Sequence, residues 1–302
     1  MTVDPTQTCS AFSAADEPLP GTAAHVTGWV LLEHPGAWGH DVLDGKALGE
    51  NLSEELTVRT KRAGVRLMLI RRPGRGDTTP RRRTVFLAHS HPENSWCERL
   101  EVGDPAELLD LDLHRIRGGA PRLGQTVTDP LTLVCAHGKR DKCCAVLGRP
   151  VAAHLAGLEA DVWECSHTGG HRFAPSLILL PSGYTYGRLD TAGSARAVEA
   201  ARRGEVAAEG LRGRSCWTPS GQVAEMTVRE RVSSRIDDLV VDESGAIPVV
   251  THRDGRRWEV NVKSEALPPR PVSCGAKPKP VQAVRVVSVR ELSPCSAPED
   301  SL

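Results

Sequence analysis

Apolar runs and one segment with helical spacing alternate along the first half of the chain. The runs Val26–Leu32, "VRLMLI" and "TVFLAH" have the composition and turn-forming borders of strands. Between the first two, "GENLSEELTVRTKRAG" has helical spacing, with Ser53 as the expected N-cap and Gly64 as the end. A short helix or turn capped by Asp104 follows the third strand. We therefore expect an N-terminal α/β unit over residues 21–125.

The second half repeats this alternation and extends it. "LTLVC" and "ADVWEC" are expected strands, and "CCAVLGRPVAAHLAGL" between them has helical spacing, with Pro150 expected to start or kink the helix. "SLILLPSGYTYGRL" predicts a hairpin, and "SARAVEAARRG" predicts a closing helix. Strand, helix, strand, hairpin, helix is the element order of a thioredoxin-like domain, which we place at residues 126–235.

The two ends of the chain differ from this α/β pattern. Residues 1–20 are polar and contain proline, so we expect a disordered tail. Residues 236–302 predict a β-hairpin followed by a Pro-rich extension with one β-like run, Val284–Val289. The expected fold class is α/β: a thioredoxin-like domain preceded by a smaller α/β unit and followed by a β-rich extension.

Charge and cysteine content narrow the function classes. Lys+Arg and Asp+Glu both total 38, so no electrostatic feature favours nucleic acid or an anionic membrane as partner. No apolar run reaches the roughly 20 residues of a membrane span, and the polar N-terminus does not resemble a secretory signal. We therefore expect a cytoplasmic protein, in which clustered members of the nine cysteines bind metal or perform redox chemistry.

The candidate chemistry lies in "CAHGKRDKCCAVLG" and "CSHTGGHRFAP". Cys135 ends one predicted strand, and Cys144 lies at the start of the following helix, where backbone N–H groups and nearby cations stabilise a thiolate. His167 and His171 follow the next strand, on a loop that contains two adjacent glycines. Neighbouring strands in a thioredoxin-like sheet would bring all four side chains to the same sheet edge.

Several chemistries fit these residues. Two thiolates and two imidazoles fit tetrahedral zinc, and they equally fit a [2Fe–2S] cluster with cysteines on one iron and histidines on the other. Cys-x8-Cys is looser than the Cys-x2-Cys knuckles of structural zinc sites, which favours a cluster. A thiol oxidoreductase or redox sensor is a further alternative, although Cys-x-x-Cys is absent at the helix start.

Other residues near the motifs have simpler interpretations. Cys143 and Cys165 are each expected to be small buried core residues. We expect His137 to be solvated or bonded to the backbone. The candidates for partners of the metal ligands are Arg140, Asp141 and Arg172.

The two motifs, together with the upstream "PGTAAHVTGWVLLEHPGAWG", closely resemble the sucrase/ferredoxin-like family in a bacterial version, over about residues 20–235. The resemblance implies a thioredoxin-like ferredoxin that holds a [2Fe–2S] cluster through Cys135, Cys144, His167 and His171, and pattern spacing favours Cys144 over Cys143. We expect an electron carrier with an unknown redox partner protein rather than an enzyme, and a ligand histidine whose second nitrogen faces water would couple reduction to proton uptake. No paired-carboxylate motif supports sucrase activity.

Overall fold

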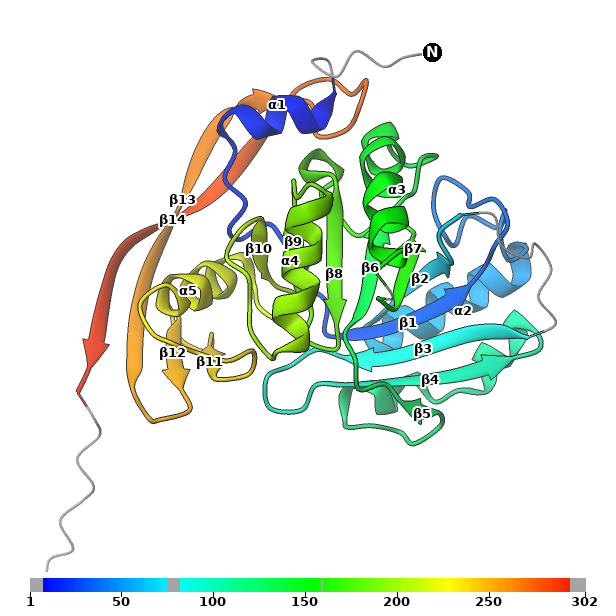
Figure 1. Cartoon of the computed structure of the whole chain (residues 1–302), viewed down its shortest axis with the longest axis horizontal. Helices are drawn as coiled ribbons and strands as arrows, with labels where there is room; N and C mark the ends of the chain where they lie inside the picture. Colours follow the sequence, from blue (N-terminus) through cyan, green and yellow to red (C-terminus); the bar gives the residue numbers. More distant parts are fainter. Residues whose placement is uncertain (1–7, 75–81, 159, 294–302) are drawn as a thin grey trace, which may run out of the picture.

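One mixed sheet runs through the centre of the molecule, and a smaller antiparallel sheet lies beside it (Figure 1). The computed structural model describes residues 8–74, 82–158 and 160–293. The large sheet contains, in spatial order, β10 (Leu211–Arg214), β9 (Tyr184–Gly187), β8 (Ser176–Leu180), β6 (Leu131–Cys135), β7 (Val162–Cys165), β2 (Val65–Arg71), β1 (Gly28–Glu33), β3 (Arg83–His89), β4 (Trp96–Val102) and β5 (Gln125–Thr126). The small sheet contains β11 (Leu239–Asp242), β12 (Val249–His252), β13 (Arg257–Arg270) and β14 (Lys279–Leu292). The predicted α/β class with a β-rich extension is confirmed.

The helices begin and end largely where capping residues allow. They are α1 (Cys9–Asp16), α2 (Glu50–Ala63), α3 (Lys142–Ala156), α4 (Thr191–Arg202) and α5 (Pro219–Arg229), with short 3-10 helices η2 (Pro105–Asp110), η3 (Leu113–Arg117) and η4 (His171–Phe173). α2 ends at Gly64 as predicted, but Ser53 is buried inside it rather than capping it. Asp104 caps η2 as expected. None of the helices in the described ranges combines the length and apolarity that crossing a bilayer requires.

The two halves of the large sheet have the same connectivity. β1 is parallel to β2 and antiparallel to β3, which pairs with β4. In the same way, β6 is parallel to β7 and antiparallel to β8, which pairs with β9. One helix connects each parallel pair, α2 in the first half and α3 in the second, so each half has thioredoxin-like topology.

The halves join where β2 pairs with β7 in antiparallel orientation, with Ile70 opposite Cys165. This pairing joins the strands of the two halves into one continuous sheet. The expected boundary between residues 125 and 126 falls inside the short strand β5. The first half therefore contributes strands to the same sheet that carries the second motif.

Helix α3 differs from its prediction in one respect. Asp141 caps it, because its side chain accepts a hydrogen bond from the Cys143 N–H at 2.9 Å, so the helix begins before the proline. Pro150 lies inside the helix on its exposed side and neither starts nor ends it. Val151 is buried, whereas Val146, which shares the predicted spacing, is 56% exposed.

The N-terminal segment is ordered from residue 8, contrary to the expected disordered tail. Residues 1–7 lie outside the described residues, and α1 follows them. Glu17 is 3% exposed and pairs with Arg172, and its carbonyl accepts a hydrogen bond from Arg188 at 2.8 Å. Ion pairs and hydrogen bonds with distant arginines therefore help to attach this segment to the rest of the chain.

The C-terminal extension contains more strand than was predicted. β13 and β14 form a long hairpin, 14 residues in each strand, that crosses the side of the molecule towards α1 (Figure 1). Arg270, at the end of β13, pairs with Asp16 of α1 at 2.5 Å. The β13–β14 end of this hairpin therefore lies at α1, whereas β14 runs back from there to the other end of the hairpin, where Leu292 pairs with Arg257.

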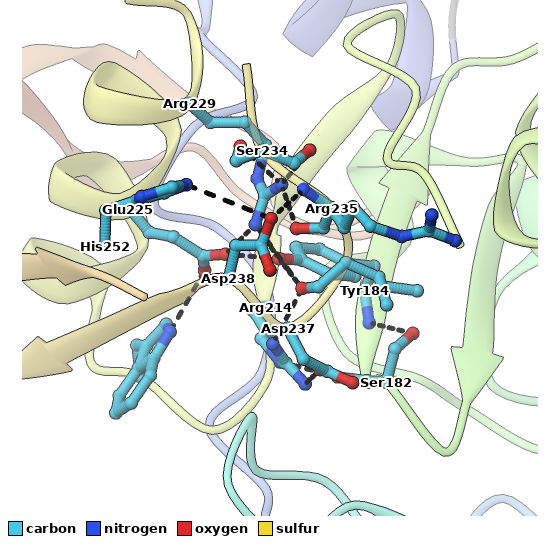
Figure 2. Close-up of polar contacts among 12 residues, drawn as sticks. Ser182, Tyr184, Arg214, Glu225, Arg229, Ser234, Arg235, Asp237, Asp238 and His252 are labelled. Carbon is cyan, nitrogen blue, oxygen red and sulfur yellow. Dashed lines mark hydrogen bonds and ion pairs between the residues drawn. The ribbon is translucent and has the colours of Figure 1, made fainter. Parts of the chain in front are cut away.

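Buried charges attach α5 to the last strands of the large sheet (Figure 2). Glu225 on α5 is fully buried and accepts hydrogen bonds from Trp217 at 3.0 Å, from Arg229 at 2.9 Å and from the Tyr184 hydroxyl. Arg214 on β10, also fully buried, donates to backbone carbonyls and to a carboxylate in the same network. These contacts hold α5, which also packs against the small sheet, next to β9 and β10.

Candidate metal centre

The carboxyl ends of β6 and β7 bring both sequence motifs to one edge of the large sheet. The two strands are parallel, with Cys135 opposite Cys165 in register. The loop after β6 leads into α3, and the loop after β7 carries His167 and then the η4 turn that begins at His171. Parallel neighbours end at the same edge, so the two loops lie side by side.

Cys135 and Cys144 form a buried thiol pair at this edge. Both residues are 0% exposed, and their sulfurs lie with one imidazole nitrogen of His167 in a group whose atoms are all within 4.8 Å of one another. α3 passes very close to β6 here, since a Cβ placed on Gly148 would lie 2.1 Å from the Cys135 carbonyl oxygen. Glycine at this position therefore lets the helix bring Cys144 to Cys135.

The two histidines lie next to each other because of the glycines between them. Gly169 and Gly170 have φ values of +96° and +68°, in the region that favours glycine. A Cβ on Gly170 would also lie 2.6 Å from a guanidinium nitrogen of Arg212. The resulting turn brings the imidazole rings of His167 and His171 to a centroid distance of 4.7 Å. His171 is not part of the 4.8 Å group, but its ring neighbours that group directly.

The Nδ1 atoms of both histidines are buried and lack a hydrogen-bond partner among the described residues. Buried polar atoms are almost always paired, so two unpaired nitrogens on adjacent rings indicate a bond to something other than protein. Neutral imidazole nitrogen and thiolate sulfur both ligate zinc and iron. The donor set of Cys135, Cys144, His167 and His171 therefore fits a metal ion or an iron–sulfur cluster.

His137 positions His167 rather than joining the donor set. Its Nε2 lies 2.7 Å from the Gly39 carbonyl oxygen, and its Nδ1 accepts the His167 N–H at 3.2 Å. The ring stacks edge-on against Trp38 and is 2% exposed. The prediction that His137 bonds to the backbone is confirmed, and the alternative prediction that it is solvated is wrong. Through Trp38 and Gly39 the first half of the chain supports the site.

Asp141, the N-cap of α3, also lies next to His171. One of its oxygens lies 4.0 Å from Nε2 of His171, the arrangement in which a carboxylate orients a metal-binding imidazole. Although burial raises the pKa of Asp141, hydrogen bonds from the N–H groups of Cys274 and Cys143 and from the Ser273 hydroxyl lower it to about 2. The carboxylate is therefore ionised at neutral pH.

Two arginines, the buried Arg212 and the half-buried Arg66, donate hydrogen bonds to the histidine loop, and the sequence did not single them out. Arg212 is 0% exposed and donates to the Gly169 carbonyl at 3.2 Å. Arg66 donates to the Thr168 carbonyl at 3.3 Å. Burial lowers the pKa of Arg212 to about 9. No sequence signal separates these arginines from the many solvated ones.

Two of the predicted partners of the metal ligands have other contacts. Arg172 donates to Glu17 at 2.9 Å and lies over the Phe173 ring. Arg140 lies 3.1 Å from Nδ1 of His40, on the loop from the first half. Of the three candidates, Asp141 is the one for which a direct contact with a predicted ligand is observed.

The two buried thiols of the site share a proton. Donation from the Cys144 thiol holds the pKa of Cys135 well below its ordinary value, and the same contact raises the pKa of Cys144. The pKa of His171 is lowered by burial and by the neighbouring His167. The lowered pKa of His171 favours its neutral imidazole near pH 7.

The remaining cysteines of the motifs separate into two environments. Cys165 is 0% exposed in the central core, and burial raises the pKa of its thiol, so its interpretation as a core residue is correct. Cys143 is also buried, but it lies beside Cys9 and Cys274 rather than in the group of Cys135, Cys144 and His167. It is therefore not a simple core residue.

Comparison with known proteins agrees with the motifs. A family model described as sucrase/ferredoxin-like matches residues 19–213, which is 195 of the 302 residues. Neither the curated proteins nor the solved structures gave a match. The matched range includes both motifs and ends within β10. The chain belongs to the sucrase/ferredoxin-like family.

Proposed function

We propose that the chain is an electron-transfer protein whose edge site holds a [2Fe–2S] cluster through Cys135, Cys144, His167 and His171. The observation that carries the proposal is the pairing of two buried thiols with two adjacent imidazoles whose Nδ1 atoms lack a partner within the described residues. Clusters with two cysteines on one iron and two histidines on the other use this donor set. The ferredoxin-like family supports the same assignment.

The arrangement of the site favours electron exchange at the histidine side. The thiols are fully buried, whereas the side chain of His171 is 13% exposed. A bound cluster supplies one-electron transfer. The imidazole edges are then the shortest route from the site to a redox partner protein, whose identity is not determined by the chain.

Charge sets the expected reduction potential. Imidazole is neutral where thiolate is negative, so two histidine ligands raise the potential above that of an all-cysteine ferredoxin. The buried guanidinium of Arg212 acts in the same direction. Nε2 of His171 faces Asp141 at 4.0 Å and can hold a proton there, so we propose that reduction is coupled to proton uptake and that the potential falls as pH rises.

Anaerobic purification followed by metal and sulfide analysis tests the assignment. We expect about two iron and two sulfide per chain, visible absorption, and a Rieske-like EPR signal after reduction. A colourless protein, or one with zinc and no iron at the edge site, would contradict the proposal. The second result would instead support a structural zinc site, and reversible disulfide exchange by the metal-free protein would support a thiol oxidoreductase.

His171→Cys tests which residues bind the second iron. A third thiolate makes the cluster more negative, so we expect the variant to keep a cluster whose potential is lower and depends less on pH. His154→Cys is the matched control, because His154 lies on the exposed side of α3. Protein-film voltammetry across a pH series measures both quantities. Equal potentials for His171→Cys and the control would remove His171 from the ligand set.

A further inference from the structure

Three cysteines from distant parts of the chain converge at the first turn of α3, next to the edge site. Cys9 begins α1, Cys143 lies in the first turn of α3, and Cys274 lies in the loop between β13 and β14. Their sulfurs are 3.6 Å apart for Cys9 and Cys143, 3.1 Å for Cys143 and Cys274, and 3.7 Å for Cys274 and Cys9. The Asp141 carboxylate oxygens lie 3.7 and 3.8 Å from the Cys9 sulfur.

Two of these separations, 3.6 and 3.7 Å, match sulfurs that share one metal ion, and the third, 3.1 Å, is shorter. A Zn–S distance of about 2.3 Å and tetrahedral angles place two sulfurs about 3.8 Å apart. In a [4Fe–4S] cluster each thiolate binds a different iron, which requires wider spacing. A disulfide requires about 2.05 Å and uses only two of the three sulfurs. A triangle of three sulfurs with a carboxylate on one side is therefore best explained by a single tetrahedral ion.

The surroundings favour thiolates at this position. The N-termini of α1 and α3 both lie beside Cys9, Cys143 and Cys274, so two helix dipoles present their positive ends to these thiols. The Ser10 hydroxyl donates to the Cys143 sulfur at 3.3 Å. Cys9 and Cys143 are 1% and 2% exposed, which excludes bulk water from the ligands.

We propose that Cys9, Cys143 and Cys274 bind one zinc ion, with the Asp141 carboxylate as the fourth ligand. Zinc suits the set because it prefers four ligands, accepts three thiolates, and in structural sites leaves no open position. The ion joins segments that lie 134 and 131 residues apart in the chain. It therefore fastens α1 and the β13–β14 loop to the start of α3.

This zinc site is separate from the edge site but shares one residue with it. Asp141 lies between them, with one oxygen 4.0 Å from Nε2 of His171 and both oxygens near the Cys9 sulfur. Cys143 and Cys144 are adjacent in α3, yet successive helical side chains point about 100° apart, so each serves a different site. The zinc site accounts for the ordered N-terminal helix, which sequence alone did not predict.

Metal content and thiol protection in the full-length protein test the zinc site. After anaerobic purification, inductively coupled plasma mass spectrometry is expected to give about one zinc ion per chain, independent of the iron count. Mass spectrometry after alkylation is expected to show all three cysteines protected until a strong zinc chelator is added. Absence of zinc with freely alkylated thiols, or a Cys143–Cys274 disulfide in the anaerobic protein, would overturn the assignment.

Single substitutions separate this site from the edge site. We expect Cys143→Ala and Cys274→Ala to lower zinc content about tenfold or more while iron and sulfide stay unchanged. Cys135→Ala should do the reverse, and Cys216→Ala, at a buried thiol in the C-terminal core, should change neither. Cys274 lies on a partly exposed loop, so its variant tests the site even if Cys143→Ala does not fold. Zinc retained in Cys274→Ala would overturn the proposal, whatever the iron count.

Discussion

Gly148 controls how closely α3 approaches the sheet, and Gly148→Ala tests whether that approach forms the edge site. A Cβ at this position would lie 2.1 Å from the Cys135 carbonyl oxygen, which belongs to the backbone of β6 and has no side-chain freedom. Real Cβ contacts are essentially never below 3.0 Å, so the helix must move by the difference between 3.0 and 2.1 Å, or about 0.9 Å. Cys144 moves with it, away from Cys135.

The change in the free energy of unfolding caused by Gly148→Ala is the difference between an overpacking cost and a gain in helix propensity. Overpacking a core contact costs about 1–3 kcal/mol. Alanine is favoured over glycine inside a helix by about 1 kcal/mol, which offsets part of this cost. We therefore expect the free energy of unfolding to fall by about 1 kcal/mol. Ligand geometry tolerates only about 0.5 Å of displacement, so cluster content should fall much more than stability does.

Iron and sulfide counts, together with urea unfolding of the same samples, measure these two effects. Gly157→Ala is the matched control, because it makes the same change at the end of the same helix, where the nearest atom to a new Cβ is 3.3 Å away. We expect the control to retain its cluster and its stability. A Gly148→Ala protein with full cluster content and unchanged unfolding would refute the argument that close helix packing builds the site.

Two further substitutions test the buried charges. Arg212→Gln removes a buried cation and its hydrogen bond to the Gly169 carbonyl, so voltammetry should give a lower reduction potential, and urea unfolding a loss of about 1–3 kcal/mol. A potential equal to that of the unaltered protein would contradict this role for the guanidinium. Glu225→Gln leaves the buried Arg229 without its carboxylate, so unfolding free energy should fall by about 3–5 kcal/mol while absorption and EPR signals stay unchanged. A loss below about 1 kcal/mol would show that the network in Figure 2 does not hold α5 in place.

The element order of the second half could be predicted because local patterns carry it. Apolar runs mark β6, β7 and β8, and helical spacing marks α3. The positions of Cys135 and His167 at the ends of neighbouring strands followed from that order, since parallel strands end at the same sheet edge. The adjacency of His167 and His171 followed from the two glycines between them.

Contacts between distant segments could not be predicted in the same way. Cys9 lies in a polar N-terminal segment, and Cys274 lies in a Pro-rich stretch, so neither has a local pattern that indicates a ligand. The β13–β14 hairpin carries Cys274 to α1, and the contact between these segments joins residues 265 positions apart, for which the chain has no local sequence signal. The burial of Arg212 and the contact of Arg66 with the histidine loop were likewise not predictable, because isolated arginines are usually solvated.

The Cys143–Cys144 doublet separates what the sequence determined from what the tertiary structure decided. The sequence alone indicated a thiolate-stabilising helix start and two histidines around Gly169 and Gly170, because these depend on neighbours a few residues away. Which thiol faces which partners was decided by contacts with distant segments: Cys144 lies beside Cys135 of β6, whereas Cys143 lies beside Cys9 of α1 and Cys274 of the β13–β14 loop. Adjacent residues of a helix point in different directions, so only the surroundings of the folded chain assign them to different sites.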